Sequence, residues 1–225
     1  LEAGLQRAAA MESELQAMLQ RLTPQHPDVA AVVPNVRVQR QQATEPNDPL
    51  FAQQWHLQAP TTFASALNLP AAWGQYTGAG VAQVVAVVDG GVRYDHPDLA
   101  GHLLPGYDFV SDVDYANDGG GRDADASDPG DWVSRAEART ATFAGCDVSS
   151  SSWHGTAIAG QIAAASQNGL GVVGVHWGAQ VLPVRVAGKC GALLSDLLDG
   201  VRWEPNFVHT HTVVMRSKTG TIRYI

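Results

Sequence analysis

The chain has 225 residues, and 45% of them are hydrophobic, which supplies enough apolar surface for a sizeable core and excludes a disordered chain. Its formal net charge of −8 at pH 7 argues against nucleic acid as a partner, because phosphate binding requires clustered lysine and arginine. No apolar run approaches the roughly 18 residues of a membrane span, so we expect no membrane partner.

The first 42 residues predict a small α+β unit. Apolar side chains recur at three- and four-residue steps between Met11 and Leu22, which is typical of one face of a helix, and Pro24 ends that helix. Residues 29–38 are rich in valine and predict a strand. The polar stretch at 39–47 then indicates an exposed linker.

Residues 43–203 alternate strand and helix patterns, as βαβ units around a parallel sheet do. A nearly unbroken valine-rich run at 81–88 predicts a strand buried on both faces, and residues 181–186 predict another. Residues 156–165 and 193–201 predict helices. We therefore expect an α/β domain with a parallel sheet.

A long stretch rich in glycine and aspartate, residues 108–131, separates the first of these strands from the first helix. A loop of this length inside a compact domain is usually functional or disordered. Its carboxylates repel one another unless a cation or solvent screens them, and no glutamate completes an EF-hand pattern. The loop is therefore either a metal site or a solvated acidic surface; its acids are Asp112, Asp114, Asp118, Asp123, Asp125, Asp128 and Asp131.

The sequence changes character after Trp203. Residues 204–225 contain no alanine, their charge is mainly positive, and Pro205 interrupts the helix that precedes it. We interpret this tail as foreign to the domain, the result of a frameshift or a broken reading frame. His209 and His211 alternate as on one strand face, where a polar surface is a simpler interpretation than a metal pair.

Two polar residues occupy positions where catalytic groups occur. Asp89 directly follows the strand at 81–88, and sites in open parallel sheets form at the carboxyl ends of strands. Taken alone, Asp89 is better explained as a turn residue before Gly90. His154 lies immediately before the predicted helix and, taken alone, is better explained as part of a capping segment.

Four strings occur in order along the chain. They are Val-Val-Asp-Gly-Gly-Val-Arg-Tyr-Asp-His-Pro-Asp-Leu at 87–99, His-Gly-Thr-Ala-Ile-Ala-Gly at 154–160, Asn-Gly-Leu-Gly-Val-Val-Gly at 168–174 and Val-Leu-Pro-Val-Arg-Val at 181–186. Together they resemble the subtilisin-like serine proteases, or subtilases, in the version of secreted bacterial enzymes. The resemblance covers about residues 47–203 and implies the N-terminal half of an α/β subtilisin-like domain with a parallel sheet.

The resemblance implies a catalytic role for each of the two polar residues. His154 would be the general base that takes a proton from a serine hydroxyl, and Asp89 would orient its ring and stabilise the imidazolium. The small residues Ala157, Ala159 and Gly160 would let the helix approach the sheet closely enough to bring the pair into contact.

The third member of the family's Asp-His-Ser triad is missing after Trp203. No Gly-Thr-Ser turn, no Ser-x-Gly strand and no oxyanion asparagine follows that residue. The resemblance therefore implies a serine endopeptidase by family, whereas we expect these 225 residues alone to be inactive. The alternatives are a noncatalytic propeptide-like binding or folding module and a calcium-stabilised structural fragment.

Residues 1–42 resemble the C-terminal part of a subtilase propeptide, which in that family occupies the active-site cleft and keeps the enzyme a zymogen. The resemblance implies peptide and protein substrates, a monomer and a secreted location, with any signal peptide outside this chain. Cys146 and Cys190 lack the spacing of a zinc site and match positions that are paired in secreted relatives, which implies a disulfide bond.

A structural calcium ion is the one cofactor that the resemblance implies. Asp48, Asp98 and Asn168 match positions that supply side-chain ligands to Ca²⁺ in thermitase-like subtilases. Because Ca²⁺ takes six to eight oxygen ligands, backbone carbonyls near Val172 would complete the site.

Overall fold

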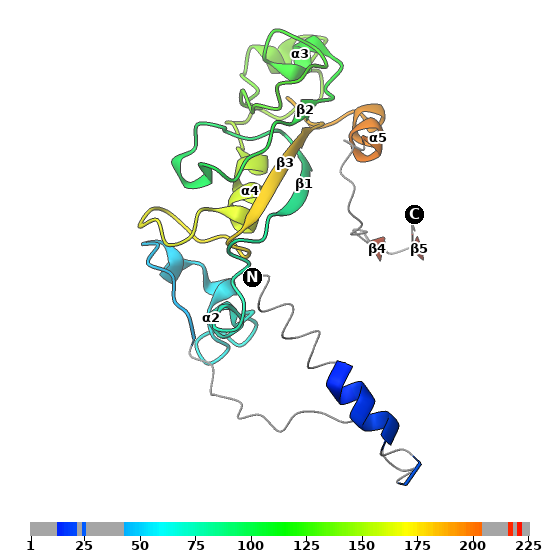
Figure 1. The fold of residues 1–225 in the computed structure, drawn as a ribbon. Coiled ribbons are helices and arrows are strands. Elements are labelled where there is room, and N and C mark those ends of the chain that lie inside the picture. Colours follow the sequence, from blue (N-terminus) through cyan, green and yellow to red (C-terminus); the bar gives the residue numbers. More distant parts are fainter. Residues whose placement is uncertain (1–12, 22–23, 26–42, 204–215, 218–219, 222–225) are drawn as a thin grey trace. The chain divides into compact units, whose positions relative to one another are not determined.

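Two units make up the chain, Leu1–Gln41 and Gln42–Ile225, in a computed structural model drawn in Figure 1. The structure describes residues 13–21, 24–25, 43–203, 216–217 and 220–221. In the first unit, residues 13–21 are helical, within the range where the sequence predicts a helix. The predicted strand at 29–38 and the pair His209 and His211 lie outside the described residues.

Three parallel strands form a sheet in the second unit, in the order β1-β3-β2. β1 (Gln83–Asp89) pairs along its whole length with β3 (Ala179–Arg185), and the short β2 (Tyr107–Asp108) pairs with the other side of β3. Two further strands, β4 (Arg216–Ser217) and β5 (Gly220–Thr221), pair antiparallel with each other. The predicted α/β fold with a parallel sheet is confirmed.

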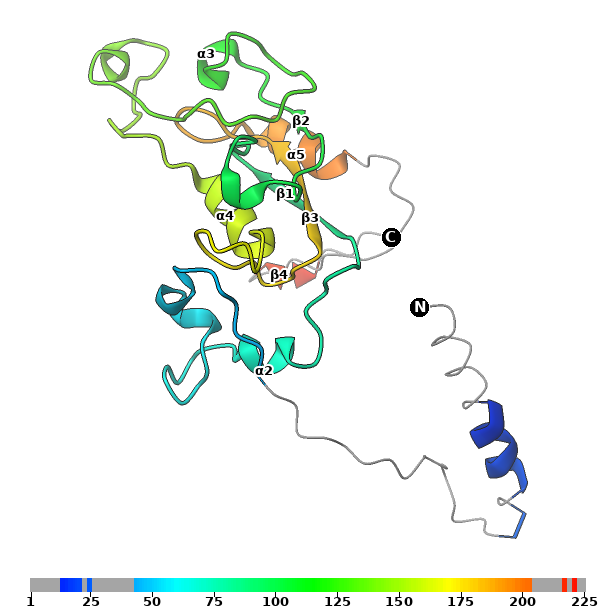
Figure 2. The ribbon, with the colours of Figure 1, turned by 60° about the vertical axis from the view of Figure 1, so that its left-hand side comes forward.

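Helices cover both faces of the parallel sheet (Figure 2). α4 (His154–Ala163) packs on one face, where its alanines share a cluster with Val87, Leu99 and Val181. α5 (Leu194–Arg202) lies on the other face, against Val186. The shorter helices are α2 (Leu69–Trp73), α3 (Val113–Ala116) and the 3-10 turns η1 (Phe51–Gln53), η2 (Trp55–Leu57), η3 (Pro97–Leu99) and η4 (Glu137–Arg139).

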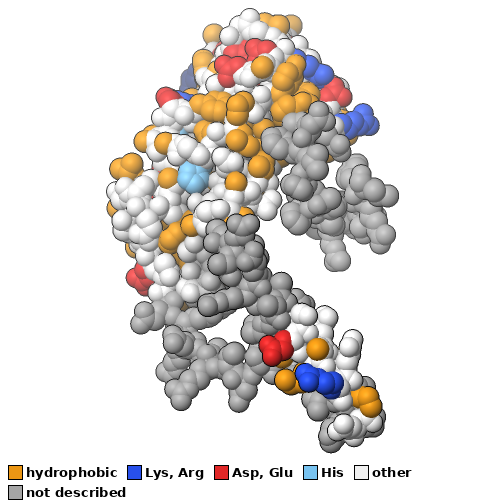
Figure 3. Space-filling model, in the orientation of Figure 1, with side chains coloured by type: hydrophobic (Ala, Val, Ile, Leu, Met, Phe, Trp, Pro, Cys, Tyr) orange, Lys and Arg blue, Asp and Glu red, His pale blue; other side chains and the backbone are white. Residues whose placement is uncertain are grey.

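The buried face of α5 carries polar and small residues, whereas its leucines are exposed. Its buried residues are Asp196 and Gly200, and a Cβ on Gly200 would lie only 2.4 Å from Val186 Cγ1. Figure 3 shows hydrophobic side chains at the surface around the sheet and α5. The exposed apolar residues of the helix are Leu194, Leu197, Leu198 and Val201.

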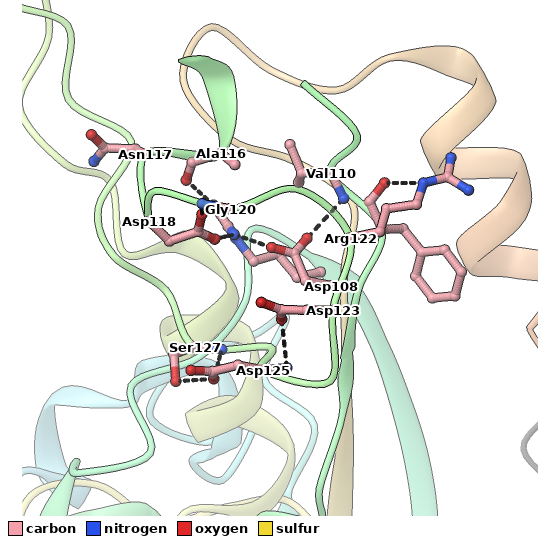
Figure 4. Close-up of polar contacts among 12 residues, drawn as sticks. Asp108, Val110, Ala116, Asn117, Asp118, Gly120, Arg122, Asp123, Asp125 and Ser127 are labelled. Atoms are coloured by element: carbon pink, nitrogen blue, oxygen red, sulfur yellow. Dashed lines mark hydrogen bonds and ion pairs between the residues drawn. The ribbon is translucent and has the colours of Figure 1, made fainter. Parts of the chain in front are cut away.

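A buried ion pair joins the edge of the sheet to the loop after β2 (Figure 4). The side chains of Arg185 and Asp108 are 1% and 0% exposed, and the guanidinium donates a hydrogen bond to Asp108 Oδ2. It also donates to Asp118 Oδ2 at 2.6 Å and to the Ala116 carbonyl. Burial raises the pKa of Asp108 to about 6, although the Val110 N–H and the guanidinium lower it, so this carboxyl is ionised at pH 7.

Candidate active site

Asp89 and His154 lie in direct contact although 65 positions separate them. His154 Nδ1 is 2.8 Å from Asp89 Oδ2, and the Gly90 N–H donates to the other carboxylate oxygen at 2.7 Å. Because an ionised carboxylate only accepts hydrogen bonds, this contact places the ring proton on Nδ1 and leaves the lone pair on Nε2. The His154 side chain is 65% exposed, and no hydrogen bond in the described part of the chain uses Nε2. That nitrogen can therefore accept a proton.

The contact depends on a glycine directly after the histidine. A Cβ at Gly155 would lie 2.2 Å from the Gly91 carbonyl oxygen and 3.1 Å from Asp89 Oδ1, so the first turn of α4 can approach the strand only without a side chain there. On the same turn, the Thr156 hydroxyl accepts the Arg93 N–H at 3.0 Å. The start of the helix is thus tied to the segment that follows β1.

The expected role of small residues later in this helix needs correction. Ala159 is fully buried, as expected, but Ala157 is exposed and a Cβ on Gly160 would meet no atom within 4 Å. Ala157 lies on the helix face turned away from the sheet, and Gly160 is half-buried at the flank of the packed face. Close approach is required instead at Gly155, where the helix begins.

A pocket of about 200 Å³ lies beside the pair. Three of its polar lining residues were not predicted to lie beside the catalytic pair, namely Asp128, Asp131 and Ser152, although the two aspartates belong to the loop considered as a possible metal site. The only sequence signals are that both aspartates end the acidic loop and that Ser152 lies two positions before His154. The remaining lining residues are Asp89, Gly90, His154, Ala187, Gly188 and Gly191.

Asp131 connects the acidic loop to the segment that carries the histidine. Its two carboxylate oxygens accept the Ser152 N–H at 2.6 Å and the Ser152 hydroxyl at 2.7 Å. Ser152 Oγ in turn accepts the His154 N–H at 3.3 Å. The carboxylate of Asp131 therefore helps to position the backbone on which the imidazole is mounted.

Most carboxylates of the acidic loop bind donors of the chain itself (Figure 4). Five of them accept the backbone N–H of the residue two positions further along: Asp112, Asp118, Asp123, Asp125 and Asp128. Among the described residues, no group of three or more His, Cys, Asp or Glu side chains is arranged to hold a metal ion. The acids therefore shape turns, and the described residues form no metal cluster in this loop.

A disulfide fastens the pocket wall that follows β3. Cys146 and Cys190 are bonded, with their Cα atoms 5.6 Å apart, as the resemblance implies. Cys190 lies between Gly188 and Gly191, two glycines that line the pocket. The bond therefore restrains one side of the pocket relative to the loop that contains Cys146.

A buried lysine fastens the same wall a second time. The Lys189 side chain is 4% exposed, and its Nζ lies 2.5 Å from Glu137 Oε1 and 4.5 Å from the centroid of the Trp132 ring. The hydrogen bonds from Lys189 and from Ser134 lower the pKa of Glu137 to about 2. The charge of Lys189 is thus neutralised outside the pocket.

The three predicted calcium ligands gather around one loop. Asp98 accepts the Asn168 side-chain amide at 2.8 Å and the Val172 N–H at 2.9 Å. Asp48 Oδ2 accepts the Gln167 N–H at 3.0 Å. The other oxygen of Asp48, Oδ1, is buried and has no hydrogen-bond partner.

Comparison with known proteins identifies the class to which this site belongs. Residues 80–213 match the subtilase family, peptidase S8. The chain is 48% identical over 158 residues to the extracellular protease of Xanthomonas campestris pv. campestris, an alignment that covers 70% of this chain and 26% of that protein. It is 45% identical over 160 residues to the extracellular basic protease of Dichelobacter nodosus, covering 70% of this chain and 25% of that protein.

A solved structure of a protease from Pseudoalteromonas arctica is 49% identical, with a TM-score of 0.63, and the match covers 74% of this chain and 47% of that one. The chain therefore belongs to the subtilase family of serine proteases and has a subtilisin-like fold. It spans about a quarter of the two curated relatives and about half of the solved structure. In the part of the chain that the structure describes, no helix is long and apolar enough to cross a membrane.

We expect Gly155→Ala to lower the free energy of unfolding by about 1–3 kcal/mol, because the added methyl group must displace the Gly91 carbonyl or the Asp89 side chain. Gly160→Ala, on the same helix, is the matched control. It meets no atom within 4 Å and should raise stability by up to about 1 kcal/mol, since alanine favours helix over glycine. Urea unfolding gives the free energy of unfolding of both variants. Equal changes in the two would contradict the conclusion that the helix approaches the strand closely at Gly155.

The Glu137–Lys189 pair should stabilise the protein in a pH-dependent way. The folded-state pKa of Glu137 is about 2, below its ordinary 4.5, so its contribution to stability is present above pH 4.5 and is lost as the pH falls toward 2. We expect Glu137→Gln to lower the urea midpoint at pH 7 and to differ progressively less from wild type below pH 4.5. A difference that stays constant from pH 7 to pH 3 would rule out this linkage.

Proposed function

We propose that Asp89 and His154 are two members of the Asp-His-Ser triad of a serine endopeptidase, whose serine lies outside these 225 residues. The observation that carries this proposal is the 2.8 Å contact between His154 Nδ1 and Asp89 Oδ2, at the carboxyl edge of a parallel sheet in a subtilase. Since no nucleophile motif follows Trp203, we also propose that this chain alone does not hydrolyse peptides.

In this mechanism, His154 Nε2 accepts the proton of the serine hydroxyl while the serine oxygen attacks the carbonyl carbon of the peptide bond. The protonated ring then transfers that proton to the nitrogen of the leaving amine as the bond breaks. Asp89 keeps the ring in the required tautomer and stabilises the imidazolium. Water, deprotonated by the same nitrogen, then attacks the acyl group and releases the carboxylic acid and the serine.

The remaining assignments follow from this proposal. Residues 1–42 are the end of an inhibitory propeptide that occupies the cleft of the zymogen, residues 43–203 are the N-terminal part of the catalytic domain, and residues 204–225 are a nonmatching tail. The enzyme is a secreted monomer that acts on peptides and proteins. The names of the extracellular relatives and the Cys146–Cys190 disulfide, a bond that persists in oxidising compartments, support secretion.

Asp48, Asp98 and Asn168 would hold a structural calcium ion in this enzyme. The buried Asp48 Oδ1 without a partner supports this assignment, because an unpaired buried carboxylate oxygen is costly unless a cation meets it. Asp98 would supply a second carboxylate, and the Asn168 amide would turn to present its oxygen in place of its NH₂ group. The ion would stabilise the fold and would not take part in hydrolysis.

In the protein that contains the serine, we expect His154→Ala to reduce kcat/KM for peptide hydrolysis by about a million-fold, as loss of the triad histidine does in subtilisin. Asp89→Asn should reduce it by about ten-thousand-fold, as the same change does in a chymotrypsin-type triad. His56→Ala, which changes a histidine outside the pocket, should leave kcat/KM unchanged. A His154→Ala enzyme within tenfold of wild type would refute the assignment. If the purified 225-residue chain hydrolyses peptides and His154→Ala abolishes that activity, the proposal that the catalytic serine lies outside these residues is refuted.

Calcium should raise the melting temperature of the 225-residue chain and EDTA should lower it. A ligand at a hundred times its Kd stabilises the folded state by about 2.7 kcal/mol, which differential scanning calorimetry detects. Asp48→Asn should reduce this response, whereas Asp114→Asn, an exposed change of equal charge, should keep it. A melting temperature that is indifferent to calcium would exclude the site.

A further inference from the structure

The pocket beside His154 carries an excess of negative charge. Three carboxylates line it, those of Asp89, Asp128 and Asp131, and no lysine or arginine is among its lining residues. His154 is the one lining side chain that can become positive. In the catalytic cycle its charge is matched by Asp89, so the other two carboxylates remain.

Asp128 presents an unused acceptor in this pocket. The residue as a whole is only 7% exposed, and its Oδ1 atom accepts the Gly130 N–H at 2.8 Å. No hydrogen bond in the described part of the chain uses Oδ2. Burial raises the pKa of Asp128, and the nearby carboxylates of Asp131 and Asp89 raise it further. Oδ2 is not among the buried atoms that lack a partner, so it is open to the pocket and can accept a hydrogen bond from a donor that a ligand brings.

The cations nearest in the chain to the pocket wall are already paired. Arg185 donates to Asp108 and Asp118, and Lys189 binds Glu137. Neither side chain can turn into the pocket without breaking a buried ion pair, which is strongly destabilising. Arg93, whose charge interacts with Asp128, is bound to Asp95 at 2.6 Å and does not line the pocket. The described residues therefore place no unpaired cation among the lining side chains.

A metal ion fits this pocket poorly. The described residues contain no group of three or more carboxylates, histidines or cysteines arranged around a common point. Asp131 is held apart by its two hydrogen bonds to Ser152. The volume of about 200 Å³ suits an extended side chain with a cationic end better than a bare ion.

We propose that this pocket is the subsite for a substrate residue next to the scissile bond and that it selects lysine or arginine there. Asp128 is its principal carboxylate and Asp131 its second. The ammonium or guanidinium group donates to Asp128 Oδ2, while the small residues Ala187, Gly188 and Gly191 leave room for the stem of the side chain. This assignment rests on the proposed function, because the pocket can receive a substrate side chain only if His154 belongs to the active site of a protease.

Cleavage of a peptide library tests the assignment in the serine-containing protein. Peptides carry lysine, arginine, glutamine or norleucine at each position within two residues of the scissile bond. We expect kcat/KM to favour the basic residues by about tenfold to a hundredfold at one of these positions. In Asp128→Asn, which keeps the acceptor for the Gly130 N–H, this ratio should fall below about threefold.

The matched control is Asp114→Asn, an exposed acid of the same loop that does not line the pocket. It changes the net charge equally and should keep both the activity and the ratio. Absence of any basic preference, or an equal preference in wild type, Asp128→Asn and Asp131→Asn, would overturn the assignment.

Failure of the proposed function is distinguishable from failure of this inference. If no peptide is cleaved, agmatine, which carries a guanidinium group, is titrated into the 225-residue chain at low salt while the NMR signals of the His154 ring are followed. A saturable shift that Asp128→Asn abolishes and Asp114→Asn keeps supports the cation subsite even without hydrolysis. No shift in the wild-type chain, tested both whole and after proteolytic removal of residues 1–42, overturns it.

Discussion

The geometry of this site depends on the ion pair between Arg185 and Asp108. Arg185 ends the central strand and is in register with both Asp89 and Asp108, so a full positive charge is buried on the strand next to Asp89. Such a charge is tolerated only when it is paired and hydrogen-bonded, and Arg185 Nε has no partner. The two terminal nitrogens must therefore satisfy the guanidinium, which binds the acidic loop to the edge of the sheet where Asp89 emerges.

From that anchor the loop returns across the end of β1 and delivers its last acids to the pocket. Val92 N–H donates to the Ala126 carbonyl at 3.1 Å, and Asp128 N–H donates to the Val92 carbonyl at 2.9 Å. Gly91 makes this crossing possible, because a Cβ there would lie 2.7 Å from the Ala126 carbonyl oxygen. The backbone of Asp128 is thus hydrogen-bonded to Val92, three residues after Asp89. Main-chain contacts therefore fix the position of Asp128 relative to the strand end that carries Asp89.

Local patterns were sufficient to predict the positions of β1, β3, α4 and α5, because valine-rich runs and helical periodicity are properties of short segments. The predicted burial of β1 on both faces was wrong, since Val87 is the one buried residue of that strand. The contact between Asp89 and His154 could be predicted from the sequence only through the family resemblance, because 65 positions separate the two residues and no local pattern links them. The roles of Asp128 and Asp131 could not be predicted, because they follow from turns and from Ser152, a tertiary partner. The periodicity of α5 likewise predicted a helix but not that its leucines face outward.

The charge of the pocket also bears on how recognition and catalysis can share one site. A cationic side chain beside His154 would by itself disfavour the imidazolium that forms during hydrolysis, because like charges repel across a few ångströms. With three lining carboxylates, one bound cation still leaves two negative charges facing the ring. Asp131, through Ser152, also holds the backbone of His154, so one of the carboxylates of the proposed subsite would also position the proposed base. The excess of carboxylates that would select a basic substrate residue would therefore also stabilise the imidazolium of His154 beside the bound cation.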